Sequence, residues 1–299
     1  MKAYKYKIRR PSKAIVAKFE QTLDLCRELY NAGLRERRDA WKLNRISLSY
    51  VEQANQLSEI KAVRDDLETV HSQVLQDVLK RLDKTFKAFF GRVKKGEKAG
   101  FPRFKGASRF DSFCFPQSGF KLVGDKLTLS KIGSVRIRLS REIVGKIKTC
   151  TIKGEVDGWY VVFTLDVEKE LLEKTGASVG VDVGVENLAT LSNGEQIENP
   201  RFLRESERRL KTAQRNMSRK KKGGNNHKKA VRLLKKQHLK IKRQRADFLH
   251  KTANSIISRF DEIVVEELQR AQYGEKSSLG KIHRGRILGK LSAISRIQS

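Results

Sequence analysis

One acidic residue stands inside an apolar stretch of this sequence. The segment VGVDVGVENLATLSNGE, residues 179–195, reads as two short strands followed by an Asn-Gly turn, and Asp182 lies in the first strand between Gly180 and Gly184. If that strand is buried, its carboxylate needs a cation or hydrogen-bond donors, because an ionised carboxylate is costly to bury alone. Asp182 is therefore a candidate metal ligand.

A second apolar strand with acids at its end occurs later in the chain. The segment EIVVEEL, residues 262–268, includes Glu266 and Glu267, and a long helix-forming run separates it from the first strand. A strand, a long crossover and a second strand usually lie side by side and parallel. Acids at matching heights could then hold a divalent metal against a phosphodiester. The alternative is that Asp182 caps a turn and both glutamates lie on the surface.

The run between the two strands is the most basic part of the chain. In residues 201–250, 19 lysines and arginines stand against 3 acidic residues, and the glycine-containing KKKGGNNHKK interrupts the pattern. The whole chain has 65 Lys and Arg against 34 Asp and Glu, a formal net charge of +31. This density favours a helical hairpin that binds phosphates over a face that is only solvated. A nucleic acid is therefore the expected partner, rather than an anionic membrane.

Other features exclude whole classes of protein. The sequence has no apolar run of about 18 residues, and its first residues, MKAYKYKIRRPSK, lack an apolar core, so we expect neither a membrane span nor a signal peptide. Cys26, Cys114 and Cys150 are far apart and form no C-x-x-C pair. This cysteine usage fits a reducing compartment and offers no zinc ribbon. We therefore expect a cytoplasmic protein without zinc.

The elements that must position the acids follow from the residue pattern. Residues 2–9 alternate as a strand does. Three later segments have the three- and four-residue apolar spacing of helices, namely residues 12–40, 48–63 and 72–95, and the apolar stripe of the third is expected to be core. After Gly96, short strand-like runs between glycine turns predict an antiparallel module, a small barrel that the N-terminal strand could join. A new domain begins near Gly176.

Several of these segments resemble motifs of the TnpB family, transposon-encoded RNA-guided proteins related to the type V CRISPR effectors. In chain order they are YKYKIRRPSKA, CRELYNAGLRER, LQDVLKRLDKTFKAFFGRVKKGEKAGFPRFKG, LSKIGSVRI, IKTCTI with WYVVF, GVDVGVENLATLSNGE, RKKKGGNNHKKA with RADFLHK, and IVVEELQ. Together they cover essentially the whole chain in the family's order. The set is specific, although no single segment is.

The resemblance implies an architecture and partners. The fold would be α+β and multidomain: a small antiparallel β-barrel (wedge) domain of residues 1–10 and 106–175, an inserted helical recognition domain of residues 11–105, and a truncated RuvC (RNase H-like) α/β domain of residues 176–299 with a basic helical hairpin at 201–260. Asp182 takes the place of the first catalytic acid and Glu266 of the second, with Glu267 as its follower. A guide RNA, a double-stranded target DNA and a bacterial, nucleoid-associated location are also implied.

Two parts of the family's pattern are missing from this sequence. The family has a zinc ribbon with two C-x-x-C pairs and a third acid, an Asp, whereas here no Asp follows Asp261. Two-metal cleavage needs carboxylates on several sides of the ions, so Asp182 and Glu266 would hold one Mg²⁺ ion at most, and weakly. We therefore expect a protein that is not an enzyme, a nuclease-dead, RNA-guided DNA-binding protein that represses transcription. Two alternatives stay open: an RNA-guided DNA endonuclease with a metal-dependent RuvC site, and an RNA-binding transposon relic.

The residues expected to contact nucleic acid form two groups. By position in the family's pattern, the candidates for reading a short DNA motif beside the target are Tyr50, Ser72, Gln73, Gln76 and Gln117, and a Gln amide can bond adenine in the major groove. The candidates for holding the backbone are Arg103, Lys105, Lys220, Lys221, Lys222, Lys228, Lys229 and Arg245. Phe101 and Phe104 could stack on a base, but we expect them to pack in the core.

Overall fold

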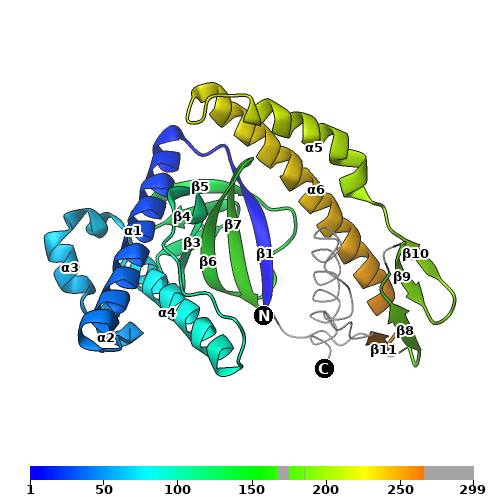
Figure 1. The fold of residues 1–299 in the computed structure, drawn as a ribbon, viewed down its shortest axis with the longest axis horizontal. Helices are drawn as coiled ribbons and strands as arrows, with labels where there is room; N and C mark the ends of the chain where they lie inside the picture. Colours follow the sequence, from blue (N-terminus) through cyan, green and yellow to red (C-terminus); the bar gives the residue numbers. More distant parts are fainter. Residues whose placement is uncertain (168–174, 185, 266–299) are drawn as a thin grey trace. The chain divides into compact units, whose positions relative to one another are not determined.

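The N-terminal strand lies inside an antiparallel sheet, not at its edge (Figure 1). The computed structural model describes residues 1–167, 175–184 and 186–265, and the chain divides into two compact units, Met1–Lys169 and Glu170–Ser299. The strands of the first unit are β1 Lys2–Arg9, β2 Ser112–Phe115, β3 Phe120–Val123, β4 Lys126–Leu129, β5 Gly133–Arg138, β6 Lys146–Glu155 and β7 Gly158–Asp166. They form one seven-stranded sheet in the order β2-β6-β7-β1-β5-β4-β3.

This order places β1 between β7 and β5, so the predicted N-terminal strand joins the antiparallel module that follows the helices. Tyr6 pairs with Val161 on one side, and Ile8 pairs with Ile137 on the other. The pairing leaves β2 and β3 as the two edges of the sheet. The fold of this unit therefore combines helices with an antiparallel sheet, and its closure into a barrel stays a prediction.

The helices of the first unit come between β1 and β2 in the chain. They are α1 Lys13–Asn44, α2 Tyr50–Asn55, α3 Leu57–Val63 and α4 Ser72–Lys94, with 3₁₀ helices η1 Asp65–Thr69 and, further on, η2 Ala107–Arg109. Pro11 precedes α1, and the Ser12 hydroxyl caps it by accepting a hydrogen bond from the Ile15 amide at 3.3 Å. The single helix predicted for residues 48–63 is divided, because α2 ends before Gln56 and α3 begins after it.

One hydrophobic core joins these helices to the sheet. The stripe predicted as core on α4 is confirmed for Val74, Leu75, Val78, Leu79, Leu82 and Phe86, but it is wrong for Phe90, which belongs to the same stripe and is 59% exposed. It packs against α1 where Gly33 allows close approach, since a Cβ there would come within 3.2 Å of Leu79 and Leu82. Helices and sheet thus support each other within one unit, and their division into wedge and recognition domains stays a prediction.

In the described part of the second unit, a small mixed sheet is accompanied by two long helices. Its strands are β8 Ser178–Asp182, β9 Asn187–Leu191, β10 Gln196–Glu198 and β11 Glu262–Val265, in the order β10-β9-β8-β11. Val179, Val181 and Leu191 are buried against Ile256, which belongs to α6 (Asn225–Ile257). One face of the sheet is therefore covered by the end of this helix.

The helix α5, Phe202–Ser218, pairs with α6 as the predicted hairpin. Phe202 meets Phe248 edge to face, with ring centroids 6.0 Å apart, and Leu210, Ala213 and Ile241 are buried. The rest of both helices is mostly polar and basic. Within the described residues, no helix combines the length and the apolar character that crossing a membrane would require.

Candidate metal and nucleic-acid site

Asp182 is the last residue of β8, and its side chain is exposed. The burial that its apolar neighbours suggested is wrong, because side chains alternate along a strand and only Val179 and Val181 point to the core. Asp182 pairs with Thr190 of β9. No hydrogen bond or ion pair engages its carboxylate within the part of the chain that the structure describes.

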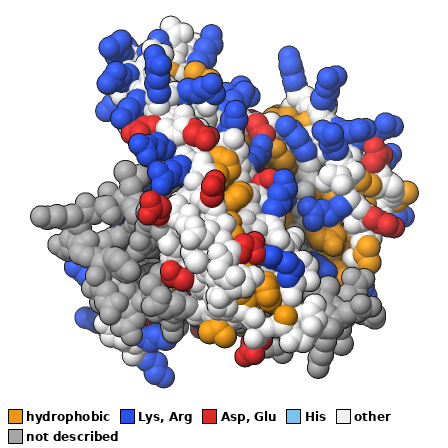
Figure 2. All heavy atoms as spheres, turned by 90° about the vertical axis from the view of Figure 1, so that its right-hand side faces the viewer, with side chains coloured by type: hydrophobic (Ala, Val, Ile, Leu, Met, Phe, Trp, Pro, Cys, Tyr) orange, Lys and Arg blue, Asp and Glu red, His pale blue; other side chains and the backbone are white. Residues whose placement is uncertain are grey.

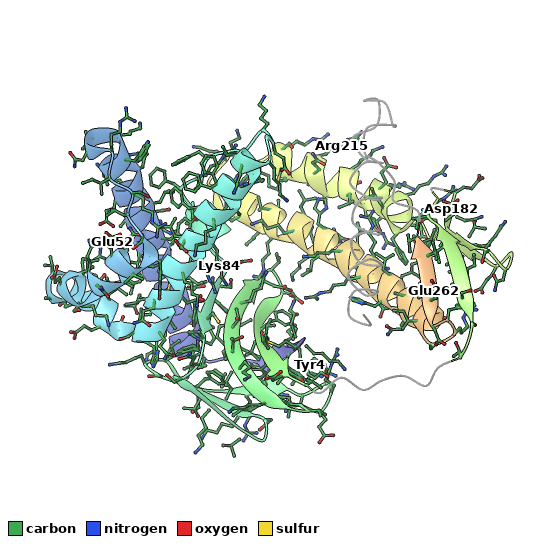
Figure 3. All side chains as sticks on the ribbon, turned by 90° about the horizontal axis from the view of Figure 1, so that it is seen from below. Tyr4, Glu52, Lys84, Asp182, Arg215 and Glu262 are labelled. Carbon is green, nitrogen blue, oxygen red and sulfur yellow. The ribbon has the colours of Figure 1, made fainter. Side chains whose placement is uncertain are left out.

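The strand β11 lies beside β8 and runs parallel to it, which confirms the crossover prediction. Val264 pairs with Gly180, and Val265 pairs with Val181. Figure 3 shows the consequence: Glu262 begins β11 at one end of the sheet, and Asp182 ends β8 at the other. Glu266 and Glu267 follow Val265 in the sequence, but both lie outside the described residues.

Two polar contacts fix the neighbouring segments of this sheet. The Asp261 carboxylate accepts hydrogen bonds from the backbone amides of Thr175, at 3.0 Å, and Gly176, at 2.7 Å, so the starts of β8 and β11 are joined. Just after the C-terminus of α6, Arg259 donates to both oxygens of Glu195 at 2.6 and 3.2 Å. These hydrogen bonds lower the pKa of Glu195. Sequence reasoning missed both contacts, because their partners are far apart in the chain.

The carboxylate of Asp182 has the chemistry of a ligand for a hard divalent cation. Mg²⁺ is usually held by one or two carboxylates together with waters and substrate phosphates. Asp182 suits that role, because its carboxylate is exposed and forms no ion pair with any described residue. The described residues contain no group of three or more His, Cys, Asp or Glu side chains that could form a complete metal cage.

The basic residues predicted on the hairpin gather at its turn. Lys220, Lys221 and Lys222 lie in the connection between α5 and α6, Lys228 and Lys229 lie in the first turns of α6, and all five are exposed. Arg245 lies further along α6, is half-buried and contacts other side chains. On the face drawn in Figure 2, Lys and Arg side chains are more widespread than acidic ones. This placement suits contact with a phosphate backbone.

Four of the five predicted DNA-motif readers lie near one another in the first unit. Ser72, Gln73 and Gln76 occupy the first turns of α4. The Gln73 carbonyl oxygen accepts hydrogen bonds from the Ser118 amide at 2.9 Å and its hydroxyl at 3.0 Å, which brings exposed Gln117 to the same place. The Gln73 carbonyl oxygen is thus engaged by Ser118, and the exposed Ser72 hydroxyl accepts a hydrogen bond from Lys61 Nζ at 2.7 Å, whereas Gln76 is exposed. Tyr50 begins α2 and packs against the hydrophobic core.

The phenylalanine side chains of the segment FPRFKG, residues 101–106, are more exposed than predicted. Arg103 is exposed, while Lys105 is fixed by Asn31, whose amide accepts from the Lys105 N–H at 2.8 Å and donates to its carbonyl at 3.0 Å. Phe101 and Phe104 were expected in the core, but they are 47% and 46% exposed. Pro102 between them is buried, so the loop is anchored there while both rings remain partly in solvent.

Comparison with known proteins decides the family. Residues 162–274 match a family model described as a probable transposase, and residues 1–45 match a model described as a helix-turn-helix domain. The chain is 30% identical to the "Putative RNA-guided DNA endonuclease InsQ" of Escherichia coli K12, over 99% of this chain and 73% of that protein. The chain belongs to the TnpB family. Another relative in Streptomyces pristinaespiralis, "Putative RNA-guided DNA endonuclease", is 32% identical over 89% of this chain and 67% of its own length.

Membership of the TnpB family corrects one expectation from the sequence. The prediction that the chain is not an enzyme is wrong, because its relatives are named as endonucleases over nearly the whole of this chain. A solved Cas12f ternary complex aligns with a TM-score of 0.40 at 14% identity, covering 94% of this chain and 70% of that one. A solved Cas12f1 complex with guide RNA and target DNA aligns with a TM-score of 0.38 at 15% identity, covering 99% of this chain and 82% of that one. At these scores the family assignment rests on the sequence relatives.

Proposed function

We propose that this chain is a guide-RNA-directed DNA endonuclease whose metal site includes Asp182. The observation that carries the proposal is the parallel register of β8 and β11. Val265 lies opposite Val181, and in the sequence each is followed at once by an acid, Glu266 and Asp182. Two carboxylates at the same end of neighbouring strands form the start of a Mg²⁺ site. The printed names of the relatives support the same activity.

In this proposal, different side chains bind the metal ion and hold the strands of the sheet in place. Mg²⁺, when bound, would stabilise charge on the phosphodiester being cleaved. Asp182 would hold the ion on the exposed face of the sheet, while Asp261 keeps β8 and β11 in register through its bonds to Gly176 and Thr175. Arg259 and Glu195 join the end of α6 to the turn after β9, which holds the other side of the sheet.

Recognition of the target would be shared between the RNA and the protein. Base pairing with a guide RNA reads the sequence, and the protein holds the backbone and reads a short flanking motif. The exposed lysines at the α5–α6 turn would hold the backbone. Gln76 and Gln117 would read the flanking motif, since their side chains are exposed near the start of α4, and Ser72 lies beside them with its hydroxyl bonded to Lys61.

A cleavage assay tests the proposal. The chain is purified with the RNA that it binds in the producing cell, a target complementary to that RNA is made, and products are measured with Mg²⁺ present. We expect cleavage by the natural chain, none above background in Asp182→Asn, and cleavage that is unchanged within about twofold in the matched control Glu186→Gln. Glu186 is an exposed acid only four positions away. Both variants should bind RNA as the natural chain does.

Two results would refute this function. If the chain purifies without RNA and binds no added RNA, it is not RNA-guided. If it binds RNA and target DNA but gives no guide-dependent product with Mg²⁺ or Mn²⁺, the endonuclease proposal fails and only guided binding remains. Equal cleavage by Asp182→Asn and the natural chain would remove Asp182 from the site.

A further inference from the structure

The end of α4 and the FPRFKG loop form a cluster of four phenylalanine rings. Phe101 meets Phe86 and Phe89 edge to face, with ring centroids 5.7 and 5.5 Å apart. Phe90 lies 5.1 Å from Phe89 and 6.2 Å from Phe86. We call these residues, Phe86, Phe89, Phe90 and Phe101, the aromatic cluster. It is built from two segments of chain within the first unit, whereas Asp182 belongs to the second unit.

The inner ring of the aromatic cluster is buried, and its outer rings are exposed. Phe86 is only 8% exposed, and the buried Arg37 guanidinium lies 5.2 Å from its ring centroid. In contrast, Phe90 is 59% exposed and Phe101 is 47% exposed. Large apolar side chains gathered at the surface mark binding sites more often than isolated ones do. Here the outer rings are held in place by the inner ones, so they offer aromatic surface at little entropic cost.

The surroundings of the cluster are strongly positive. Residues 83–105 contain eight lysines and arginines and two acids, Glu97 and Asp83, which pairs with Lys87 at 2.8 Å, and every residue from 91 to 98 is exposed. On the neighbouring helix, Arg38 lies 5.4 Å from the centroid of the Phe104 ring, which is itself 46% exposed. A second copy of this chain would bring the same positive charge to the surface and be repelled. The rim therefore favours a polyanion as the occupant.

Exposed rings beside phosphate-binding cations are the features that bind single-stranded nucleic acid. Unpaired bases stack on aromatic side chains, while a basic groove holds their phosphates. A duplex keeps its base faces stacked on each other and offers only its backbone to such a surface. Phe90, Phe101 and their basic rim therefore have the chemistry to favour unpaired nucleotides over a duplex.

We propose that the aromatic cluster binds an unpaired segment of the guide RNA, with bases stacked on Phe90 and Phe101 and phosphates held by the flanking lysines and arginines. This inference rests on the proposed function, because it takes the RNA of that complex as its ligand. It adds a site that distinguishes unpaired from paired RNA. The lysines at the α5–α6 turn have no comparable group of aromatic side chains among the described residues.

The test compares two RNA probes of equal length, one single-stranded and one a blunt duplex, by fluorescence anisotropy with the full chain. The double variant Phe90→Leu/Phe101→Leu keeps apolar side chains but removes the stacking faces. We expect its Kd for the single strand to rise about tenfold to a hundredfold, and its Kd for the duplex to stay within about twofold. The matched double variant Phe90→Tyr/Phe101→Tyr should bind both probes as the natural chain does.

Salt dependence separates stacking from charge. The leucine variant should keep the slope of log Kd against log salt, because no phosphate contact is lost, whereas Lys94→Gln/Lys95→Gln should lower the slope for both probes. The single variant Phe90→Leu, at the most exposed ring of the cluster, gives the same answer if the double variant is misfolded.

Three results would overturn the inference. One is an equal loss for both probes in the leucine variant, and another is no loss for either. The third is a natural chain that sediments as a dimer and a leucine variant that sediments as a monomer, which would assign the surface to a second copy. If the natural chain cleaves target DNA under RNA guidance while the leucine variant binds the single strand normally, this inference fails and the proposed function stands. If the natural chain binds no RNA, the proposed function itself fails.

Discussion

Replacing Gln53 with alanine should destabilise the first unit strongly. Gln53 lies on α2, is 1% exposed, and accepts a hydrogen bond from Arg37 Nε at 2.7 Å. Its amide also donates to the Gly33 carbonyl at 3.0 Å and to the Glu36 carboxylate. Arg37 is 8% exposed; among the described residues its Nη1 donates to Asp83 at 3.3 Å, and its buried Nη2 has no hydrogen-bond partner. The variant would therefore leave a buried guanidinium short of an acceptor.

The expected loss follows from these bonds. A buried hydrogen bond to a charged group is worth about 1.5–3 kcal/mol, and a neutral one about 1 kcal/mol. Losing the bonds to Arg37 and Gly33 should cost about 3 kcal/mol of unfolding free energy. With a urea dependence of about 2 kcal/mol per molar, the midpoint should fall by about 1.5 M.

The assay is urea unfolding followed by tryptophan fluorescence. The two tryptophans of the chain, Trp41 and Trp159, both lie in the first unit, so their signal reports that unit alone. The control is Gln21→Ala, an exposed position on α1, which should change stability by less than about 0.5 kcal/mol. A decrease in unfolding free energy of less than about 1 kcal/mol for Gln53→Ala would show that the hydrogen bonds of Gln53 contribute little to the stability of the first unit.

Two further predictions use the same fluorescence assay. Gly145→Ala should lower the free energy of unfolding by more than about 2 kcal/mol, because φ is +94° there and the new Cβ would collide with the Asp166 carbonyl. In the control Gly91→Ala, on α4, the new Cβ meets no atom, so the free energy of unfolding should rise by about 0.5–1 kcal/mol. Equal effects of the two substitutions would contradict this reasoning. Burial and nearby lysines lower the pKa of His71 in the folded protein. The folded state therefore favours the neutral imidazole, which contributes stability above about pH 6.5. This contribution is lost as the pH falls through about 6.5 toward the lower pKa of the folded state. The urea midpoint should therefore decrease between pH 7.5 and 5.5 in the natural chain and decrease less in His71→Gln; the same decrease in both would disprove the assignment.

Periodicity in the sequence predicted most of the elements correctly. The apolar spacing of residues 72–95 gave α4 and its buried face, because that face is wide and regular. The order of strand, crossover and strand predicted the parallel pairing of β8 and β11, since few other connections are sterically accessible. The break between α2 and α3 at Gln56 has no glycine or proline to signal it, so the pattern could not show it.

The environment of individual side chains was harder to predict. Asp182 was expected to be buried because its neighbours are apolar, yet alternation along a strand that is covered on one face exposes it. Phe101 and Phe104 were expected in the core because they are aromatic, yet the loop is anchored by Pro102 and Asn31. Whether a side chain is covered depends on segments distant in sequence, such as α4 beside the FPRFKG loop, and no local pattern records them.

The central position of β1 also determines when the sheet can form during synthesis of the chain. Residues 2–9 are synthesised first, but their partners are β5 and β7, at Gly133–Arg138 and Gly158–Asp166. At about 5–20 residues per second, the strand waits roughly ten to thirty seconds before its last partner exists. Pairings this distant in sequence also fold slowly. The sheet can therefore be completed only after β7 is made, and deleting residues 2–9 would divide it into two halves, β2-β6-β7 and β5-β4-β3.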